Sequence, residues 1–525
     1  MIDTVALREK VLDLAIRGKL VPQDPNDEPA SVLLERIRAQ KQQMVKDGKL
    51  KAKDIKDDSI IFVGEDNLHY EKFADGTVEC IEDEIPFDIP NAWVWVRLGS
   101  LAQYKKGPFG SSITKSMFVP DSPSAIKIYE QKNAISKDAT LGNYFISEEK
   151  YESLKGFEIF PHDIIVSCAG TIGETYVMPE TMRKGIINQA LMKISLYDLR
   201  ILDFYLIYFD CQLKNVAREQ GHGVALKNIP PFDVLKKYLV PIPPIQEQAH
   251  IVRTVNDLLD TVNGMDAARD ELYDSITSVK SKILDLAIRG KLVPQNPDDE
   301  PASVLLERIR AEKEELIRQG KIKRDKKESV IVKGEDNSYY DEIPKNWAMT
   351  TLNQLTHALL LNDGDWILSE NMNPQGEVKL IQLGSVGMMR YVDKGFKYLA
   401  ENTFQKLNCT QIYSGYMLIN RIVSDKMCSC ILPSIEGKLI TTVDTCWVAP
   451  KEEWYNLKYL MYTLSSPTFQ SLVMLNSAGT TRKRISKNNL INLPFAVPPL
   501  EEQYRIVEAI DNAFNQLDTI AESLN

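Results

Sequence analysis

Two nearly identical segments of 28 residues constrain the fold of this chain more than any other feature of its sequence. LDLAIRGKLVPQDPNDEPASVLLERIRA spans Leu12–Ala39, and the segment returns 272 residues later at Leu284–Ala311 with changes at only two positions. A second pair of repeats, PIPPIQEQAHIV at Pro241–Val252 and AVPPLEEQYRIV at Ala496–Val507, is separated by 255 residues. A chain that contains the same segments twice is expected to build the same structural unit twice.

The residues after the first proline pair have the spacing of a coiled-coil helix. Apolar side chains recur at alternating intervals of four and three residues, interrupted only by Arg269; they are Ile251, Val255, Leu258, Val262, Met265, Leu272, Ile276, Val279, Ile283 and Leu286. This spacing predicts a helix from about Gln246 to Arg289 that ends at Gly290 and is roughly 60 Å long. A core helix of a globular domain is the alternative, and the polar flanks of the stripe favour the coiled coil.

The two ends of the chain together repeat this central helix. Residues 501–525 correspond to 246–270, and residue 1 corresponds to 273, so only 271 and 272 have no counterpart. We therefore predict a second helix split between Glu501–Asn525 and about Thr4–Arg17. It should pack antiparallel against the central helix around a pseudo-two-fold axis, which requires the two termini to lie close together.

A turn with the sequence KLVPQ follows each glycine, and a short charged helix is predicted next. Pro29 and Pro301 stand where a proline in the first helical position belongs, and the helices should end near Gly48 and Gly320. The lysine-rich stretches KLKAKDIKDD and KIKRDKKE follow. Solvated linkers are the simplest interpretation of these stretches, and phosphate contacts are the alternative.

Two segments of about 150 residues lie between these connectors and share a frame but not their interiors. They open with DEIPFDIPNAWVWVRLGSL and DEIPKNWAMTTLNQL, contain short β-branched runs typical of strands, and each has one late helix, at about Leu202–Arg218 and Asn456–Val473. The predicted fold class is α+β, with two mixed α/β domains joined by two long antiparallel helices. The predicted parts are 1–82 (helical region and linker), 83–243 (first domain), 244–340 (long helix, helical hairpin and linker), 341–498 (second domain) and 499–525 (C-terminal helix).

Composition and missing motifs exclude several classes of protein. The net charge of −10 argues against a protein that coats nucleic acid non-specifically, although a local basic surface remains compatible with it. No run of about 18 apolar residues predicts a membrane span, and MIDTVALREK lacks the apolar core of a signal peptide. The seven cysteines form no CxxC pair, which fits reduced thiols in a cytoplasmic protein.

No catalytic residues, cofactor loop or metal ligands are predicted. The five histidines have no metal-binding spacing, and no G-x-x-x-x-G-K-[ST] loop occurs. NIPPF at Asn228–Phe232 is similar to the Asn-Pro-Pro-Phe box of amino-methyltransferases, but Ile229 interrupts it, and NLPF at Asn492–Phe495 lacks a proline.

The segment AGTTRKRISKNN (Ala478–Asn489) has the residue types best suited to DNA. Arginine and lysine contact phosphates and guanine edges, whereas threonine and asparagine suit phosphates and adenine. Its candidate contacts are Thr480, Thr481, Arg482, Lys483, Arg484 and Lys487. The corresponding loop GHGVALKNI has only Lys227 and Asn228, with Val224 and Ala225 in place of the threonines. A solvated basic loop is the alternative.

Other loops supply weaker candidates. YKKGPFGSSITK combines a basic pair, glycines and serines, which suits phosphate contacts or, alternatively, a tight turn. SCAGTIGETY and GIINQALM suit contacts in a DNA groove or a structural hairpin. Together with polar positions of the second domain, the candidates are Lys105, Lys106, Ser111, Ser112, Thr171, Asn188, Gln189, Gln382, Arg390, Asn420, Arg421 and Lys426.

Taken in this order, the motifs resemble those of the specificity (S) subunits of type I restriction-modification systems over essentially the whole chain. The resemblance is carried by both copies of the LAIRGKLVPQ…LLERIRA segment, the two proline-pair repeats, GPFGSS, GTIG with NQA, and GTTRKRI. The first domain departs from the usual Gly-Thr-Thr loop at Val224 and Ala225. The second domain lacks counterparts of GPFGSS and GTIG.

The resemblance implies two target recognition domains, each reading one half of a bipartite, asymmetric site in double-stranded DNA. The helix pair would act as a ruler between half-sites one to two helical turns apart. It also implies two methyltransferase (M) subunits bound through the repeated helices, which use S-adenosylmethionine to methylate a flipped-out adenine in each half-site. Motor-nuclease (R) subunits would join for restriction, and S-adenosylmethionine, ATP and Mg²⁺ are expected on these partners.

Two other functions remain open from the residues alone. A coiled-coil adaptor for protein partners would show no sequence-specific DNA binding together with its M partner. An enzyme with unrecognised motifs would bind a cofactor as an isolated chain, and we expect no such binding.

Overall fold

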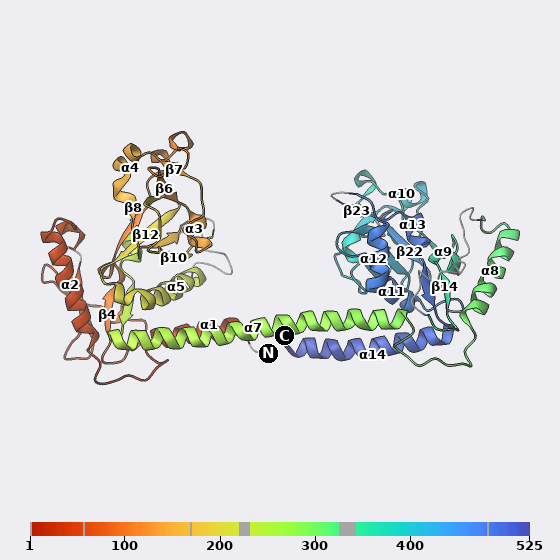
Figure 1. The fold of residues 1–525 in the computed structure, drawn as a ribbon, viewed down its shortest axis with the longest axis horizontal. Coiled ribbons are helices and arrows are strands. Elements are labelled where there is room, and N and C mark those ends of the chain that lie inside the picture. Colours follow the sequence, from red (N-terminus) through yellow and green to blue (C-terminus); the bar gives the residue numbers. More distant parts are fainter. Residues whose placement is uncertain are drawn as a thin grey trace. The chain divides into compact units, whose positions relative to one another are not determined.

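A computed structural model describes residues 3–55, 58–168, 171–219, 232–324, 343–479 and 482–524 (Figure 1). The chain forms two compact units, Ile2–Ala268 and Arg269–Asn525, the second of which also takes in Met1. Each unit contains a mixed α/β domain, a short charged helix and part of a long helix. The predicted α+β class is therefore confirmed.

The long helix α7 (Ile245–Ile288) runs through both units and has 44 residues, which corresponds to about 66 Å. It begins and ends one residue before the predicted limits. Gly290 follows it with φ +65°, and a Cβ atom there would lie 2.3 Å from Pro344. Gly18 has the same φ and would meet Pro90 at 2.5 Å. Each repeat therefore needs glycine at this position both for its backbone conformation and for the close approach of a proline.

The two parts of the split helix match the predicted limits within one residue and have the predicted direction. α1 (Thr4–Ile16) pairs with the first part of α7, where the Thr4 hydroxyl donates to Asp266 at 2.9 Å and Ala15 packs near Ile251. An early residue of α1 thus meets a late residue of this part of α7. α14 (Leu500–Leu524) lies beside the second part, where the Tyr273 hydroxyl donates to the Ala521 carbonyl at 3.1 Å (Figure 1). Both pieces are antiparallel to α7.

The buried stripe of α7 differs from the predicted seam. Val255, Val262 and Ile276 are buried as expected, but Leu258, Met265, Leu272 and Val279 are 37%, 42%, 38% and 45% exposed. The positions that face α1 and α14 in their place are polar: Asp266 pairs with Arg8 at 2.7 Å, and Lys280 pairs with Asp518. The prediction was wrong for four of the ten stripe positions because these ion pairs, which no apolar pattern reveals, shift the seam.

The charged helices α2 (Ala30–Lys46) and α8 (Ala302–Arg318) end before Gly48 and Gly320 as predicted. Pro29 and Pro301 lie one position earlier than expected, because their ψ angles of 144° and 142° make them caps outside the helices. Residues 59–80, which we assigned to a linker, form an antiparallel three-stranded sheet of β1 (Ser59–Val63), β2 (His69–Phe73) and β3 (Val78–Cys80).

The first domain contains two four-stranded sheets. The first has the order β10-β9-β12-β5 with antiparallel neighbours, and the second has the order β7-β6-β11-β8, in which β6 and β11 are parallel. β13 pairs with β4 where the domain begins and ends. The strands are β4 (Val94–Arg97), β5 (Ala102–Lys106), β6 (Ile126–Tyr129), β7 (Phe145–Ile146), β8 (Glu158–Ile159), β9 (Ile164–Ser167), β10 (Thr175–Val177), β11 (Gly185–Ile187), β12 (Leu191–Leu196) and β13 (Leu239–Ile242). The helices are α3 (Gln131–Ile135), α4 (Glu148–Leu154), α5 (Leu202–Glu219) and α6 (Phe232–Leu235).

The second domain repeats this topology with other residues. Its sheets have the orders β20-β18-β22-β15 and β17-β16-β21, with β16 and β21 parallel, and β14 pairs with β24. The strands are β14 (Ala348–Thr350), β15 (Leu361–Asp363), β16 (Val378–Ile381), β17 (Phe396–Leu399), β18 (Met417–Asn420), β19 (Ile422–Val423), β20 (Ser429–Ile431), β21 (Leu439–Thr441), β22 (Thr445–Val448), β23 (Lys483–Arg484) and β24 (Phe495–Val497). The helices are α9 (Leu352–Leu355), α10 (Glu401–Lys406), α11 (Leu457–Ser465), α12 (Pro467–Leu475) and α13 (Lys487–Ile491).

The late helices follow the prediction in the first domain and depart from it in the second. α5 begins at the predicted residue and ends one residue later. The expected single helix at Asn456–Val473 is two helices, α11 and α12, because Ser466 is extended and caps α12 by accepting from the Phe469 amide at 3.3 Å. Pro467 in the first turn of α12 has no N–H to continue α11.

The two kinds of repeat meet at a buried carboxylate in each unit. In the first unit, Glu247 accepts from the Trp93 indole at 2.9 Å and from the Gln23 side chain at 3.0 Å. In the second, Glu502 accepts from Trp347 at 3.0 Å and Gln295 at 2.6 Å. Both carboxylates are at most 2% exposed. The KLVPQ turn, the start of the domain and the proline-pair helix are therefore fastened together in the same way twice.

Candidate nucleic-acid interface

The basic segment of the second domain, Ala478–Asn489, contains the short strand β23 near the end of the four-stranded sheet. β23 pairs with β19, so that Arg484 lies opposite Ile422, and Arg484 also bridges back to Ala478. The Ile485 amide donates to the Arg421 carbonyl at 3.0 Å, which fixes the segment against the end of β18. Arg482 therefore lies near the end of the sheet at which β15 and β18 finish and β22 begins.

The four basic residues of this segment divide into two pairs. Arg482 and Lys483 are exposed, and within the described residues they make no ion pair. Arg484 pairs with Asp444 at 2.9 Å, and Lys487 donates to the Asn362 side chain at 2.6 Å and lies 4.0 Å from Asp363. Arg482 and Lys483 therefore carry the uncompensated charge, whereas the other two shape the segment. Thr480 and Thr481 lie outside the described residues.

Arg421 lies inside the domain, although we expected it on the surface. It is 4% exposed; one of its terminal guanidinium nitrogens is 3.2 Å from Asp363 and donates to the Val443 carbonyl. This burial counts against Arg421 as a DNA contact and favours a structural role, since it ties the ends of three strands together.

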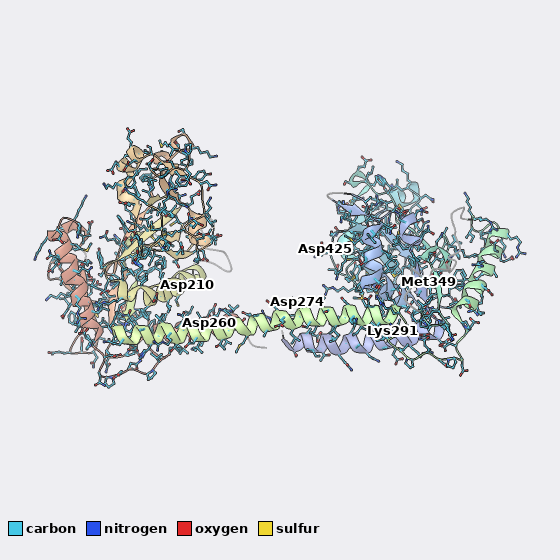
Figure 2. The ribbon with its side chains drawn as sticks, in the orientation of Figure 1. Asp210, Asp260, Asp274, Lys291, Met349 and Asp425 are labelled. Atoms are coloured by element: carbon cyan, nitrogen blue, oxygen red, sulfur yellow. The ribbon has the colours of Figure 1, made fainter. Side chains whose placement is uncertain are left out.

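The other candidates of the second domain have two kinds of surroundings. The Gln382 side chain donates to the Lys394 and Gly395 carbonyls at 2.9 and 3.2 Å, and Asn420 accepts from the Ile422 amide at 2.8 Å. These two side chains therefore stabilise local turns. Arg390 and Lys426 are exposed. Lys426 adjoins Asp425, which Figure 2 labels at the edge of the domain.

In the first domain, the end of β5 and the turn before β12 come together. Lys105 and Lys106 end β5 and are exposed, and a Cβ atom at Gly107 would lie 1.8 Å from the Asn188 carbonyl oxygen. The GPFGSS loop therefore crosses directly over the turn that contains Asn188 and Gln189. Gln189 is exposed, whereas the Asn188 side chain accepts from the Ala190 amide at 3.0 Å and so stabilises its own turn.

The remaining candidates of the first domain lie in other segments. Ser111 and Ser112 lie in a single helical turn after Phe109, and Ser111 is exposed. Thr171 is exposed, and its backbone carbonyl accepts a hydrogen bond from the Ser167 hydroxyl at 2.6 Å. Lys227 and Asn228 lie outside the described residues.

The electrostatics of Cys168 and Cys430 do not suit nucleophilic catalysis. Burial raises the pKa of the Cys168 thiol to about 11 and that of the Cys430 thiol to about 12. These thiols remain protonated near neutral pH, and the thiolate is the reactive form. In the described part of the chain, no group of acidic, histidine or cysteine side chains is arranged to hold a metal ion.

A family model described as the type I restriction modification DNA specificity domain matches residues 90–272 and 344–525, more than half of the chain. The chain belongs to this specificity family. It is 25% identical to the Escherichia coli type I restriction enzyme EcoEI specificity subunit over 99% of this chain and 90% of that protein. It is 28% identical to the E. coli EcoAI specificity subunit over 67% of this chain and 62% of that protein.

A solved structure has the same fold. It comes from work titled "Structural basis underlying complex assembly and conformational transition of the type I R-M system" and aligns with a TM-score of 0.50 and 15% identity. The alignment covers 84% of this chain and 94% of the other. None of the described helices is long and apolar enough to cross a membrane.

Proposed function

We propose that this chain recognises a bipartite site in double-stranded DNA, with residues 83–243 reading one half and residues 341–498 reading the other. The observation that carries the proposal is one strand framework built twice with different residues at the same edge. Met192 pairs with Lys106 in the first domain, and the corresponding Cys446 pairs with Asp363 in the second. A shared frame with a changed surface suits two different ligands of one class.

Charge supports DNA as that class. The protein has a net charge of −10, yet Lys105 and Lys106 at one domain edge and Arg482 and Lys483 at the other are exposed cations. Contacts to phosphates position a protein on DNA, and polar side chains at base edges supply sequence preference. Local basic edges on an acidic protein favour selective binding over general coating of nucleic acid.

The exposed apolar stripe of α7 supports docking of methyltransferase subunits on the repeated helices. Leu258 and Met265 in the first unit, and Leu272 and Val279 in the second, recur every seven residues and are each more than a third exposed. Apolar positions at this spacing are typical of a surface that packs against another helix. The repeated segments would let two M subunits dock in the same way, and motor-nuclease subunits would complete a restriction complex.

In this proposal the chemistry belongs to the partners. The M subunits would bind S-adenosylmethionine and methylate N6 of an adenine in each half-site, while ATP and Mg²⁺ would serve the R subunits. The chain itself binds, orients and spaces the DNA, and α7 would set the separation of the half-sites.

Mapping of N6-methyladenine across the genome of cells that express this chain with its M subunit tests the proposal. A two-part motif with a fixed gap is the expected result. Methylation without a common motif, or binding of the complex to genomic fragments regardless of sequence in a gel shift, would contradict it. Binding to protein partners without any DNA binding would favour the coiled-coil adaptor instead.

A further inference from the structure

Two exposed aromatic side chains occupy the same place in the two domains. Phe109 is 87% exposed and Trp366 is 68% exposed. Within the described residues, neither ring stacks on another aromatic ring or lies beneath a cation. Their sequence surroundings, GPFGSS and GDWILS, gave no reason to compare them.

Strand register establishes that the two positions correspond. The Gly107 amide donates to the Leu191 carbonyl at 2.9 Å after the end of β5, and the Gly364 amide donates to the Thr445 carbonyl at 2.9 Å after the end of β15. β5 and β15 are the corresponding edge strands of the four-stranded sheets that the two domains share in topology. Phe109 and Trp366 each follow two residues after the corresponding glycine.

Both glycines allow a close crossing over the neighbouring turn. A Cβ atom at Gly107 would lie 1.8 Å from the Asn188 carbonyl oxygen, and one at Gly364 would lie 2.4 Å from the Thr441 and Thr442 carbonyl oxygens. Any larger residue would push the loop away. The aromatic ring is therefore held close to the turn that carries the DNA candidates of the first domain.

The residue before each ring is anchored. Pro108 is buried. Asp365 is held on three sides: its amide donates to Thr441 at 2.8 Å, its carbonyl accepts from Val443 at 2.9 Å, and its carboxylate accepts from the Thr410 amide at 2.9 Å. Because the backbone beside each exposed ring is already fixed, little backbone freedom remains to be lost on binding. This favours a contact residue over a loose loop tip.

A cation stands beside the edge strand in both domains but comes from different elements. In the first domain it is Lys105 of β5 itself. In the second, Asn362 occupies the corresponding position of β15 and accepts from Lys487 of α13 at 2.6 Å, although Asp363 at 4.0 Å partly compensates this lysine. Each aromatic loop therefore follows an edge strand that has a cation beside it, and a base and its phosphate are adjacent in DNA.

We propose that Phe109 and Trp366 each stack on a base in their own half of the DNA site, and that this contact is tolerant of sequence. The inference rests on the proposed function. Positions that read sequence are expected to differ between domains with different targets. Lys106 and Asp363, which directly precede the two corresponding glycines, differ in this way. A ring retained at both places suits a contact that every base can make through its π-face. The ring reaches that face where the stack is opened, as beside an extruded nucleotide.

Tryptophan fluorescence tests the second domain directly. Of the six tryptophans, all within the described residues, Trp366 is exposed, whereas the other five are at most 5% exposed. The difference in emission between wild-type and Trp366→Phe complexes with the M subunit isolates the signal of this side chain. We expect specific DNA to quench this signal and to protect it from acrylamide. Equal acrylamide quenching with and without DNA would refute stacking in this domain.

Substitutions at Phe109 test the first domain. Phe109→Leu keeps an apolar side chain without a π-face, and Phe109→Trp keeps the ring. We expect the leucine variant to bind specific DNA about 5- to 150-fold more weakly, which corresponds to about 1–3 kcal/mol, and the tryptophan variant to recover most of that loss. An unchanged thermal midpoint is expected for both, because the side chain is exposed. Full affinity of Phe109→Leu would refute the proposal.

The methylated motif separates this inference from the proposed function. If the wild-type complex yields a two-part motif but the Trp366 signal and the Phe109→Leu affinity do not change, stacking alone is refuted. If no two-part motif appears, the proposed function fails whatever the rings do. With stacking, Phe109→Leu should lower methylation at all sites while the bases of the motif stay the same, and a relaxed base preference in one half would contradict sequence tolerance.

Discussion

Removal of the two uncompensated cations of the basic segment in the second domain should weaken DNA binding in a way that a salt titration can measure. The perturbation is Arg482→Ala together with Lys483→Ala. Both side chains are exposed and make no ion pair within the described residues, so their loss leaves no buried group without a partner. The fold is expected to tolerate the change, which a thermal midpoint within a degree or two of wild type would verify.

The magnitude follows from counterion release. Each phosphate charge that a protein neutralises contributes about 0.9 to the slope of log K against log salt concentration, so two contacts contribute about 1.8. Over a threefold rise in salt, the wild-type complex should therefore lose about 7-fold more affinity than the double variant. Arg484→Ala should change the slope much less, because Asp444 already compensates that charge at 2.9 Å.

The assay is a salt titration of DNA binding by the complex with its M subunit, on DNA that contains the mapped motif. A matched control removes two exposed lysines elsewhere in the same unit that are not among the candidate contacts, Lys397→Ala with Lys406→Ala. An unchanged slope in the Arg482 and Lys483 variant, or an equal change in the control, would refute the assignment of these residues to phosphate contacts.

Three further outcomes are expected. Arg421→Met should lower the free energy of unfolding of the second unit by about 3 kcal/mol in a denaturant titration, because it leaves Asp363 without its buried partner, whereas Lys426→Met at an exposed position should have no effect. Burial raises the pKa of Glu502, so its contribution to stability is fully present below the unfolded-state value of about 4.5 and is lost as pH rises through the higher folded-state value. Glu502→Gln should therefore gain thermal stability relative to wild type between pH 4.5 and 8, and a constant difference across that range would show that the carboxyl does not titrate as described. Fluorophores attached near the two termini should transfer energy efficiently if the second long helix is split between them, and a long distance would contradict the circular layout.

Local signals predicted most of the helical framework. A glycine, which adopts φ +65° without strain, and a proline, which cannot continue a helix, mark helix limits within one residue, as at Gly290 and Pro301. The face of α7 that is buried could not be predicted in the same way. Apolar spacing favoured Leu258 and Met265, but the partner helix is held by polar pairs such as Arg8 with Asp266, which depend on two distant segments meeting.

The candidate site was predictable where residue type alone carries the chemistry and not where position does. Arg482 and Lys483 stood out because arginine and lysine suit phosphates. Trp366 did not, since its correspondence with Phe109 appears only in the strand register. The joint at Glu502 left a signal that could have been found: Trp93 and Trp347, and Glu247 and Glu502, recur at nearly the same spacing in the two halves. The five-part division of the chain stays a prediction.

The carboxylate joints also set an order in which the chain can be completed during synthesis. In the first unit, Gln23, Trp93 and Glu247 all precede residue 268, where that unit ends, so its joint can close while the second half is still being made. In the second unit, Gln295 and Trp347 must wait for Glu502, which is made more than 150 residues after Trp347. Because domains tend to fold as units in the order of translation, the first unit should be finished early, and the joint of the second should remain open until Glu502 has left the ribosome.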